Sequence, residues 1–140
     1  MRVSAKCDYA CKALLELTLH WPDKKPVQIH EISEKQDIPI KYLVQILIQL
    51  KRIGFVDSIR GKEGGYNLAI APDKITLGKV MREIGGPLLP MANHAVKNEQ
   101  TFGRIWHEVE NVMAKVLDKV TFEDIVNKVR GRGKAVVYQI

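Results

Sequence analysis

The stretch 28–71 constrains the fold more than any other part of the chain, because two helical patterns run directly into a glycine-rich hairpin pattern. Apolar side chains recur at three- and four-residue steps over 29–36 and over 39–53, which predicts two helices joined by a short turn. Pro39 suits the first position of the second helix, where a missing N–H costs nothing, and Gly54 suits the residue that caps its end. A helix–turn–helix is therefore the expected unit.

A β-hairpin is expected directly after this unit. Residues 55–59 and 66–70 alternate between apolar and polar side chains, as half-buried strands do, and the sequence RGKEGG between them contains three glycines. Glycine adopts backbone conformations that are closed to other residues and allows another backbone to approach closely. The hairpin would form the wing of a winged helix-turn-helix domain.

Most of the remaining chain has helical periodicity. Helices are predicted over 3–20 and 77–84, from 101 onward, and from 121 to 129. The last of them begins with the sequence TFED, which resembles a capping box. The predicted fold class is therefore mostly α with a small β-hairpin.

Three parts are expected along the chain. The winged helix-turn-helix domain should occupy residues 1–84 and be followed by a loop over 85–100, where no periodicity is found. A long helix, a short helix and a tail should make up residues 101–140.

The long helix is apolar on two sides and must be covered twice. One side is a coiled-coil-like seam with alternating steps of three and four residues, made of Phe102, Ile105, Val109, Val112 and Val116. The other side is made of Trp106, Met113, Leu117 and Val120. We expect one side to pack on its own domain and the seam to meet a second copy in a homodimer. The alternative is one helix that is wholly buried within the monomer.

Positive charge concentrates on the helix-turn-helix and the wing. The chain has 22 Lys and Arg residues against 16 Asp and Glu residues, and between 39 and 62 five Lys and Arg residues oppose only Asp57. A basic surface suits a polyanion, and its position on this unit favours double-stranded DNA as the partner. The alternative is a winged-helix module whose long helix binds another protein.

A DNA complex would use the exposed face of the second helix together with the wing. Lys41 and Gln45 project near the start of that helix, which would enter a major groove. Tyr42 would contact phosphate or pack beneath the helix. Arg60 at the base of the wing would enter the adjacent minor groove, and Lys62 would contact phosphate.

Other functional classes have little support in the sequence. It contains no phosphate-binding glycine motif, no metal-ligand spacing and no convincing nucleophile–base pair, so an enzyme is not expected. It also lacks an apolar run near the ~18–20 residues of a membrane span, and its first residues do not resemble a signal peptide. A cytoplasmic location is expected.

With these segments assembled, the chain resembles the Rrf-type winged-helix regulators typified by IscR, NsrR and CymR. The resemblance covers nearly the whole chain: MRVSAKCDYACKAL resembles the first helix, EISEKQDIPIKYLVQIL the helix-turn-helix, and GFVDSIRGKEGGYNLA the wing, which is the most specific segment. It implies a homodimer that crosses its long helices and binds a partly palindromic operator. It also implies that Lys12, Lys41, Tyr42, Arg60 and Gly61 lie where members of the family contact DNA.

The chain departs from the sensing members of this family in one place. They usually carry three cysteines in the loop before the long helix, and these hold an iron–sulfur cluster, whereas PLLPMANHAVKNEQTFG contains none. No cofactor is therefore expected. The resemblance to other members that lack these cysteines implies that a small molecule or a partner protein supplies the signal. The loop 87–100 and the cleft between the long helix and the winged domain are where an effector would act.

Cys7 and Cys11 are the two cysteines of the chain and lie one helical turn apart. Asp8 stands where some members add a cluster ligand, and His94 lies in the loop. Three roles remain open for the thiols: packing, a redox-active pair, or an atypical cluster or metal site, for which two subunits would have to bring four thiolates together. Two cysteines at this spacing on an intact helix are poorly placed for an intramolecular disulfide.

Overall fold

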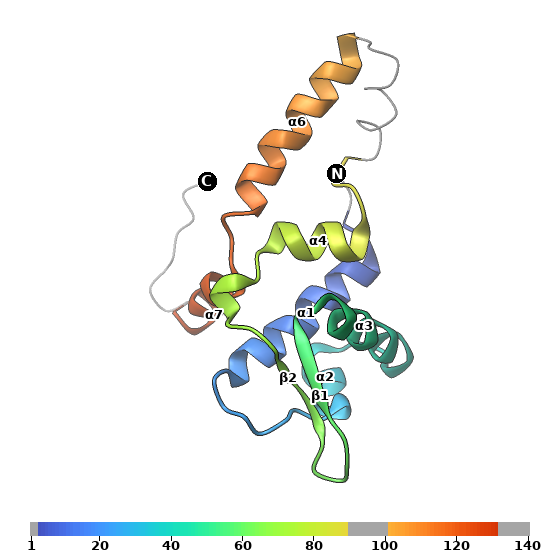
Figure 1. The fold of residues 1–140 in the computed structure, drawn as a ribbon, viewed down its shortest axis with the longest axis vertical. Helices are drawn as coiled ribbons and strands as arrows, with labels where there is room; N and C mark the ends of the chain where they lie inside the picture. The colour runs from blue at the N-terminus through green and yellow to red at the C-terminus, as the bar shows by residue number, and fades with distance from the viewer. Residues whose placement is uncertain (1–2, 90–100, 132–140) are drawn as a thin grey trace.

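The computed structural model describes residues 3–89 and 101–131 and confirms a mostly helical chain with one antiparallel hairpin (Figure 1). In chain order the elements are α1 (Ala5–His20), α2 (Ile29–Gln36), α3 (Ile40–Ile53), β1 (Val56–Ile59), β2 (Gly65–Leu68), the 3-10 helix η1 (Pro72–Lys74), α4 (Leu77–Gly85), α6 (Thr101–Leu117) and α7 (Phe122–Arg130). Among these described helices, none is both long and apolar enough to cross a membrane.

Helix α1 is the centre of the core. It packs against α2, α3, α4, α7 and β2, and its Ala10, Ala13 and Leu14 have no exposed surface. The helix begins at Ala5 rather than at residue 3, because the Ser4 side chain accepts a hydrogen bond from the Cys7 N–H, at 3.1 Å, and caps it.

The turn between α2 and α3 is held by its own residues. Asp37 takes a left-handed conformation with φ of 52°, which ends α2. The Ser33 hydroxyl donates to the carbonyl of the buried Ile38 at 2.6 Å. Pro39 is the N-cap of α3 rather than its first helical residue, so the expected position was wrong by one residue. Because α2 ends in a fixed turn, it holds the start of α3 in a defined direction.

Helix α3 ends as the sequence predicted, at Gly54, but the hairpin begins later than expected. Gly54 has a φ of 99°, and the Phe55 N–H donates back to the Leu50 carbonyl at 3.0 Å, a helix-ending motif that glycine favours. Phe55 therefore belongs to this cap and lies in the core, 1% exposed. The strands pair from Val56 opposite Leu68 to Ile59 opposite Gly65, instead of spanning 55–59 and 66–70.

The short helix after the long one returns to the winged domain. Thr121 and Asp124 form the capping box that the sequence predicted, and Phe122, which follows Thr121, is 1% exposed in the same core as α1. A β-bridge between Thr76 and Thr121 joins this start to the start of α4. The winged domain thus receives one of its covering helices from residues beyond the long helix.

Candidate DNA interface

Helix α3 separates a buried face from an exposed one. Leu43, Ile46, Leu47 and Leu50 are at most 1% exposed and fix the helix on the core. Lys41, Tyr42 and Gln45 are exposed near its start. Tyr42 is 51% exposed, so Leu43 and not Tyr42 begins the buried stripe. This leaves the three side chains free to meet another molecule at the first turns of the helix.

The exposed ring of Tyr42 is held by contacts on both sides. It stacks on Tyr9 of α1 with 6.2 Å between ring centroids and 25° between planes, and the Lys41 ammonium lies 5.4 Å from its centroid. Beside these rings is a hollow of about 390 Å³ that Lys6 and Gln45 also line. The start of α3 therefore presents ordered polar and basic groups next to the start of α1. Tyr9 was missed from the sequence, where its only signal is its place beside Ala10 at the edge of the buried stripe of α1.

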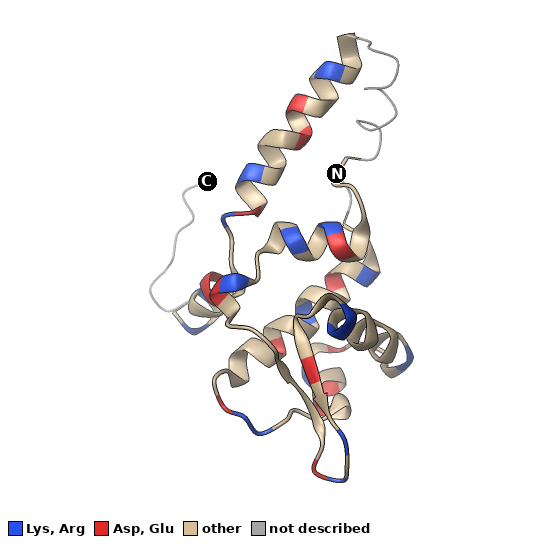
Figure 2. Cartoon of the chain, in the orientation of Figure 1, with Lys and Arg blue, Asp and Glu red and all other residues tan. Residues whose placement is uncertain are grey.

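The second group of predicted contact residues lies on the wing. Arg60, Gly61 and Lys62 are all exposed at the turn between β1 and β2. Figure 2 shows basic and acidic positions together at this turn, and the acid there is Glu63. Neither Arg60 nor Lys62 forms an ion pair within residues 3–89 and 101–131. Both cations are thus available to an anionic partner.

Glycine shapes the wing for two different reasons. Gly61 has a φ of 110°, which side-chain-bearing residues rarely adopt. At Gly64 a methyl group would overlap the carbonyl oxygen of Ile59, and at Gly65 it would overlap that of Val27. The sequence suggested that another backbone approaches these glycines closely. At Gly64 and Gly65 that backbone belongs to the same chain. Gly65 lets β2 lie against the segment before α2, where Val27 and Tyr66 exchange backbone hydrogen bonds of 2.9 and 2.8 Å.

Lys12 is already engaged with a neighbour. Its ammonium lies 2.9 Å from the Asp8 carboxylate one turn earlier, with both side chains about half exposed. The hydrogen bond that Lys12 donates to Asp8 is the main reason why the pKa of Lys12 is raised. A DNA phosphate at this position would have to share the ammonium with Asp8, unlike at Arg60 and Lys62.

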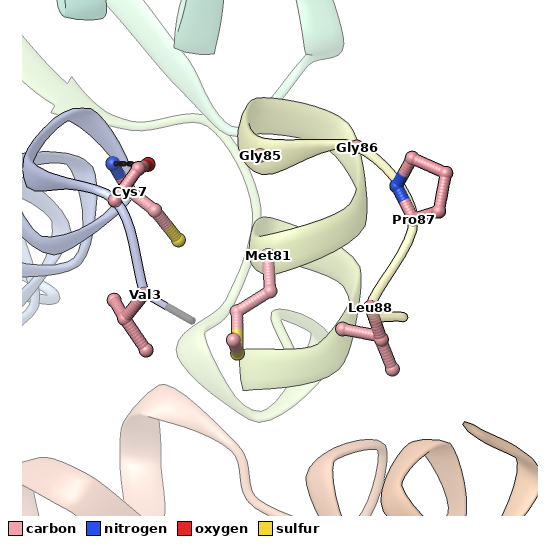
Figure 3. A pocket seen from close by; sticks show the side chains of 8 residues that line it. Val3, Cys7, Met81, Gly85, Gly86, Pro87 and Leu88 are labelled. Atoms are coloured by element: carbon pink, nitrogen blue, oxygen red, sulfur yellow. Dashed lines mark hydrogen bonds between the residues drawn. The ribbon is translucent and has the colours of Figure 1, made fainter. Parts of the chain in front are cut away.

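The Cys7 side chain points from α1 toward α4 (Figure 3), and Cys11 lies one turn later on α1. Cys7 is 2% exposed and lines a small cavity with Met81 and Gly85 of α4. A hydrogen bond with Cys11 lowers the pKa of Cys7, against the opposing effects of burial and of Asp8. The same bond, followed by burial, raises the pKa of Cys11. Each thiol is thus partnered by the other inside one chain.

Two hollows in the described part of the chain, one small and one large, are compared as candidate effector sites. The cavity at Cys7, next to the end of α4, has about 40 Å³, space for only one or two waters. A hollow of about 860 Å³, the size of a metabolite site, lies instead between the 21–27 connection and the hairpin. His94 and most of the loop 87–100 fall outside the described residues.

The long helix leaves its seam uncovered. It rises away from the winged domain in Figure 1. Among the described residues, Met113, Ala114 and Leu117 near its end pack against the core. The five seam residues are exposed by 65%, 41%, 40%, 61% and 60% for Phe102, Ile105, Val109, Val112 and Val116. The alternative of a helix wholly buried within the monomer is therefore wrong.

Comparison with known proteins identifies the family. Residues 3–128 match the family model described as "Rrf2: Iron-dependent Transcriptional regulator". The chain belongs to the Rrf2 family. It is 35% identical to a putative HTH-type transcriptional regulator of Synechocystis sp. over 131 residues, which are 89% of this chain and 87% of that protein. It is 30% identical to CymR of Bacillus subtilis over 141 residues, which cover 100% of both.

Solved structures of Rrf2 regulators share the fold. CymR of B. subtilis superimposes with a TM-score of 0.79 at 30% identity, covering 91% of this chain and 97% of that one. IscR of T. potens gives a TM-score of 0.77 at 29% identity and covers 100% and 94%. The resemblance seen in the sequence is therefore confirmed. This Rrf2 chain is a DNA-binding transcriptional regulator, from a family of regulators and not of enzymes.

Proposed function

We propose that this protein is a cytoplasmic homodimer that represses transcription from a partly palindromic operator without an iron–sulfur cluster. A small molecule or a partner protein would supply its signal. A dimer seated on DNA blocks access to the duplex that it covers, which makes repression the simplest outcome. The observation that carries the proposal is the set of exposed groups at the start of α3 and on the wing.

These groups match the two demands of duplex recognition, which are contacts to base edges and contacts to the phosphate backbone. Lys41 and Gln45 stand at the start of α3, the end of a recognition helix that reaches base edges. Tyr42 is oriented by its stack on Tyr9, so its hydroxyl can reach phosphate without further ordering. Arg60 and Lys62, on the wing, can reach the adjacent minor groove and the backbone.

Support for a homodimer comes from the seam of the long helix. An apolar stripe of five residues, each at least 40% exposed in a single chain, is more than isolated surface residues explain. A second copy would cover it with an identical stripe, because a two-fold interface uses the same surface on both subunits. A symmetric dimer would in turn read two related half-sites.

Support for a cluster-independent regulator comes from the ligands that the chain offers. A cluster needs about four protein ligands, mostly thiolates, and the sequence contains only two cysteines. Cys7 is buried against α4 of its own chain, which does not suit a cluster shared between subunits. Asp8 is bound to Lys12. The residues present do not fit a cluster, so no step of the regulation is assigned to one.

Duplex binding tests the proposal. The full-length protein is used to select fragments from a duplex library, and the affinity is then measured from 50 to 200 mM salt, over which several phosphate contacts predict a steep fall of about 10³-fold or more. Arg60→Ala should weaken binding by roughly 10- to 100-fold and leave the oligomeric state unchanged.

Lys74→Ala is the matched control, because it removes one positive charge from η1, which packs on α7 and not on the wing. Its affinity should stay close to that of the unmodified protein. Equal affinities for Arg60→Ala and Lys74→Ala would refute the role of the wing. A protein that selects no duplex would refute the proposal as a whole.

A further inference from the structure

A buried acid lies at the end of α1, outside the DNA interface. Glu16 is 3% exposed, although it carries a carboxylate among otherwise apolar core residues. Burying a carboxylate is costly unless donors or a cation compensate it. Its partners come from α1 and from α2, so whatever compensates it also joins these two helices.

Five side chains form this cluster, which we call the α1–α2 cluster: Glu16, His20, Glu31, Lys35 and Gln36. The His20 Nε2 lies 3.2 Å from the Glu16 Oε2 and 3.4 Å from the Glu31 Oε2. One ring nitrogen carries one proton or one lone pair, so it cannot bond well to both oxygens at once. A cation between the three atoms would bind all of them.

The spacing of these atoms suits a zinc-like ion. Zinc binds imidazole nitrogen and carboxylate oxygen at about 2.0–2.2 Å in a tetrahedron, whose ligand atoms are therefore about 3.3–3.6 Å apart. The two measured separations from the His20 nitrogen are 3.2 and 3.4 Å, and the ligand atoms of Glu16, His20 and Glu31 all lie within 4.8 Å of one another. Water would complete the tetrahedron.

The surroundings of the cluster supply an outer shell and an entry path. The Gln36 amide donates to Oε1 of Glu16 at 2.9 Å, which fixes the carboxylate through the oxygen that faces away from His20. Such outer hydrogen bonds orient metal ligands. The side chains of His20 and Glu31 are 32% and 35% exposed, so an ion can enter from solvent.

Lys35 is the competing cation. Its ammonium lies 3.1 Å from Glu31 and 3.9 Å from Glu16, and its hydrogen bond is the main reason why the pKa of Glu31 is lowered. One ammonium balances one of two carboxylates. Because the Lys35 side chain is 55% exposed, it can move into solvent when a divalent ion takes its place.

We propose that Glu16, His20 and Glu31 form a binding site for a zinc-like divalent transition-metal ion, which ties the end of α1 to α2. The site is separate from the two cysteines and from the DNA-contacting residues. Since α2 leads through the Ser33–Ile38 turn into α3, a bound ion fixes the support of the recognition helix.

Metal binding by the chelator-treated, full-length protein tests this site. Titration calorimetry with Zn²⁺ should show one ion per chain, and a hundredfold excess over Kd should raise Tm by roughly 5–10 °C. Co²⁺ should give the visible bands of a tetrahedral nitrogen and oxygen site without the near-ultraviolet charge-transfer absorption of thiolate ligands. A spectrum with thiolate absorption would place the ion on the cysteines and overturn the proposal.

Matched variants separate this site from adventitious binding. His20→Gln and Glu31→Gln keep the size of partly exposed side chains and should each lower Zn²⁺ affinity about tenfold or more. His30→Gln removes an exposed histidine of α2 that is not one of the proposed ligands, and it should lower Zn²⁺ affinity far less than His20→Gln. Equal affinities for His20→Gln and His30→Gln, or no Zn²⁺ uptake at micromolar concentration, would overturn the proposal.

Lys35→Gln gives a test in the opposite direction. Removing the competing ammonium should raise Zn²⁺ affinity severalfold, whereas a purely structural ion-pair network would only be weakened by this change. A loss of affinity in Lys35→Gln would contradict the proposed exchange of cations. Duplex binding, measured in parallel, reports independently on the proposed regulator, so failure of the metal site and failure of the DNA interface are distinguishable.

Discussion

Gly61 and Gly64 of the wing must be glycine for different physical reasons. Gly61 has a positive φ but open space around it, whereas Gly64 has the Ile59 carbonyl where a methyl group would stand. Gly61→Ala should therefore lower the free energy of unfolding by about 1–3 kcal/mol through backbone strain alone, and Gly64→Ala should lower it further because the chain must shift. Urea unfolding measures both. A larger loss for Gly61→Ala than for Gly64→Ala would contradict this assignment.

Whether a residue's role could be predicted depends on how far away its partners lie in the sequence. The caps at Gly54 and Thr121 were predicted, because each depends on neighbours within a few residues. The stack of Tyr9 on Tyr42 and the hydrogen bond from Gln36 to Glu16 join residues 20 or more positions apart. Their spacing becomes visible only after α1, α2 and α3 have packed together.

At the scale of elements, α6 has the two apolar sides that its periodicity predicted, and these two sides differ in how they pack. Met113 and Leu117 meet the core, while the seam stays exposed. The sequence assigned the seam to a second copy, and the seam is indeed exposed, but Trp106 of the other side is also 37% exposed. The bridge between Thr76 and Thr121 holds the chain to the domain where it returns after α6.

The seam gives a direct test of the dimer. Val112 is 61% exposed in one chain, so Val112→Glu should leave the subunit folded but place a charge in the subunit interface, where an unpaired charge is strongly unfavourable. We expect the dimer dissociation constant to rise at least tenfold, measured by analytical ultracentrifugation. Asn111→Glu adds the same charge on the polar side of α6 and should leave the dimer intact. Dimers of unchanged strength in Val112→Glu would exclude the seam as the interface.

At the scale of the whole molecule, the Rrf2 fold is retained while the usual thiolate ligands of an iron–sulfur cluster are missing from the sequence. The two cysteines are free thiols that share a hydrogen bond, and Cys7 lies beside Met81 and Gly85 of α4. Loss of either thiol should therefore change packing rather than signalling. We therefore expect the signal to act outside the thiols and without the cluster chemistry of the sensing members.

Purification without oxygen tests whether the protein holds an iron–sulfur cluster. We expect a colourless preparation with no stoichiometric iron or sulfide that still binds its selected duplex. Cys7→Ala and Cys11→Ala should bind DNA within about twofold of the unmodified protein, because neither thiol lies on the exposed face of α3 or on the wing. Visible absorption with stoichiometric iron that disappears in Cys7→Ala would instead make α1 an atypical cluster site. In that case two chains would have to open α4 to bring their thiols together, and the dimer, rather than the loop before α6, would be the sensor.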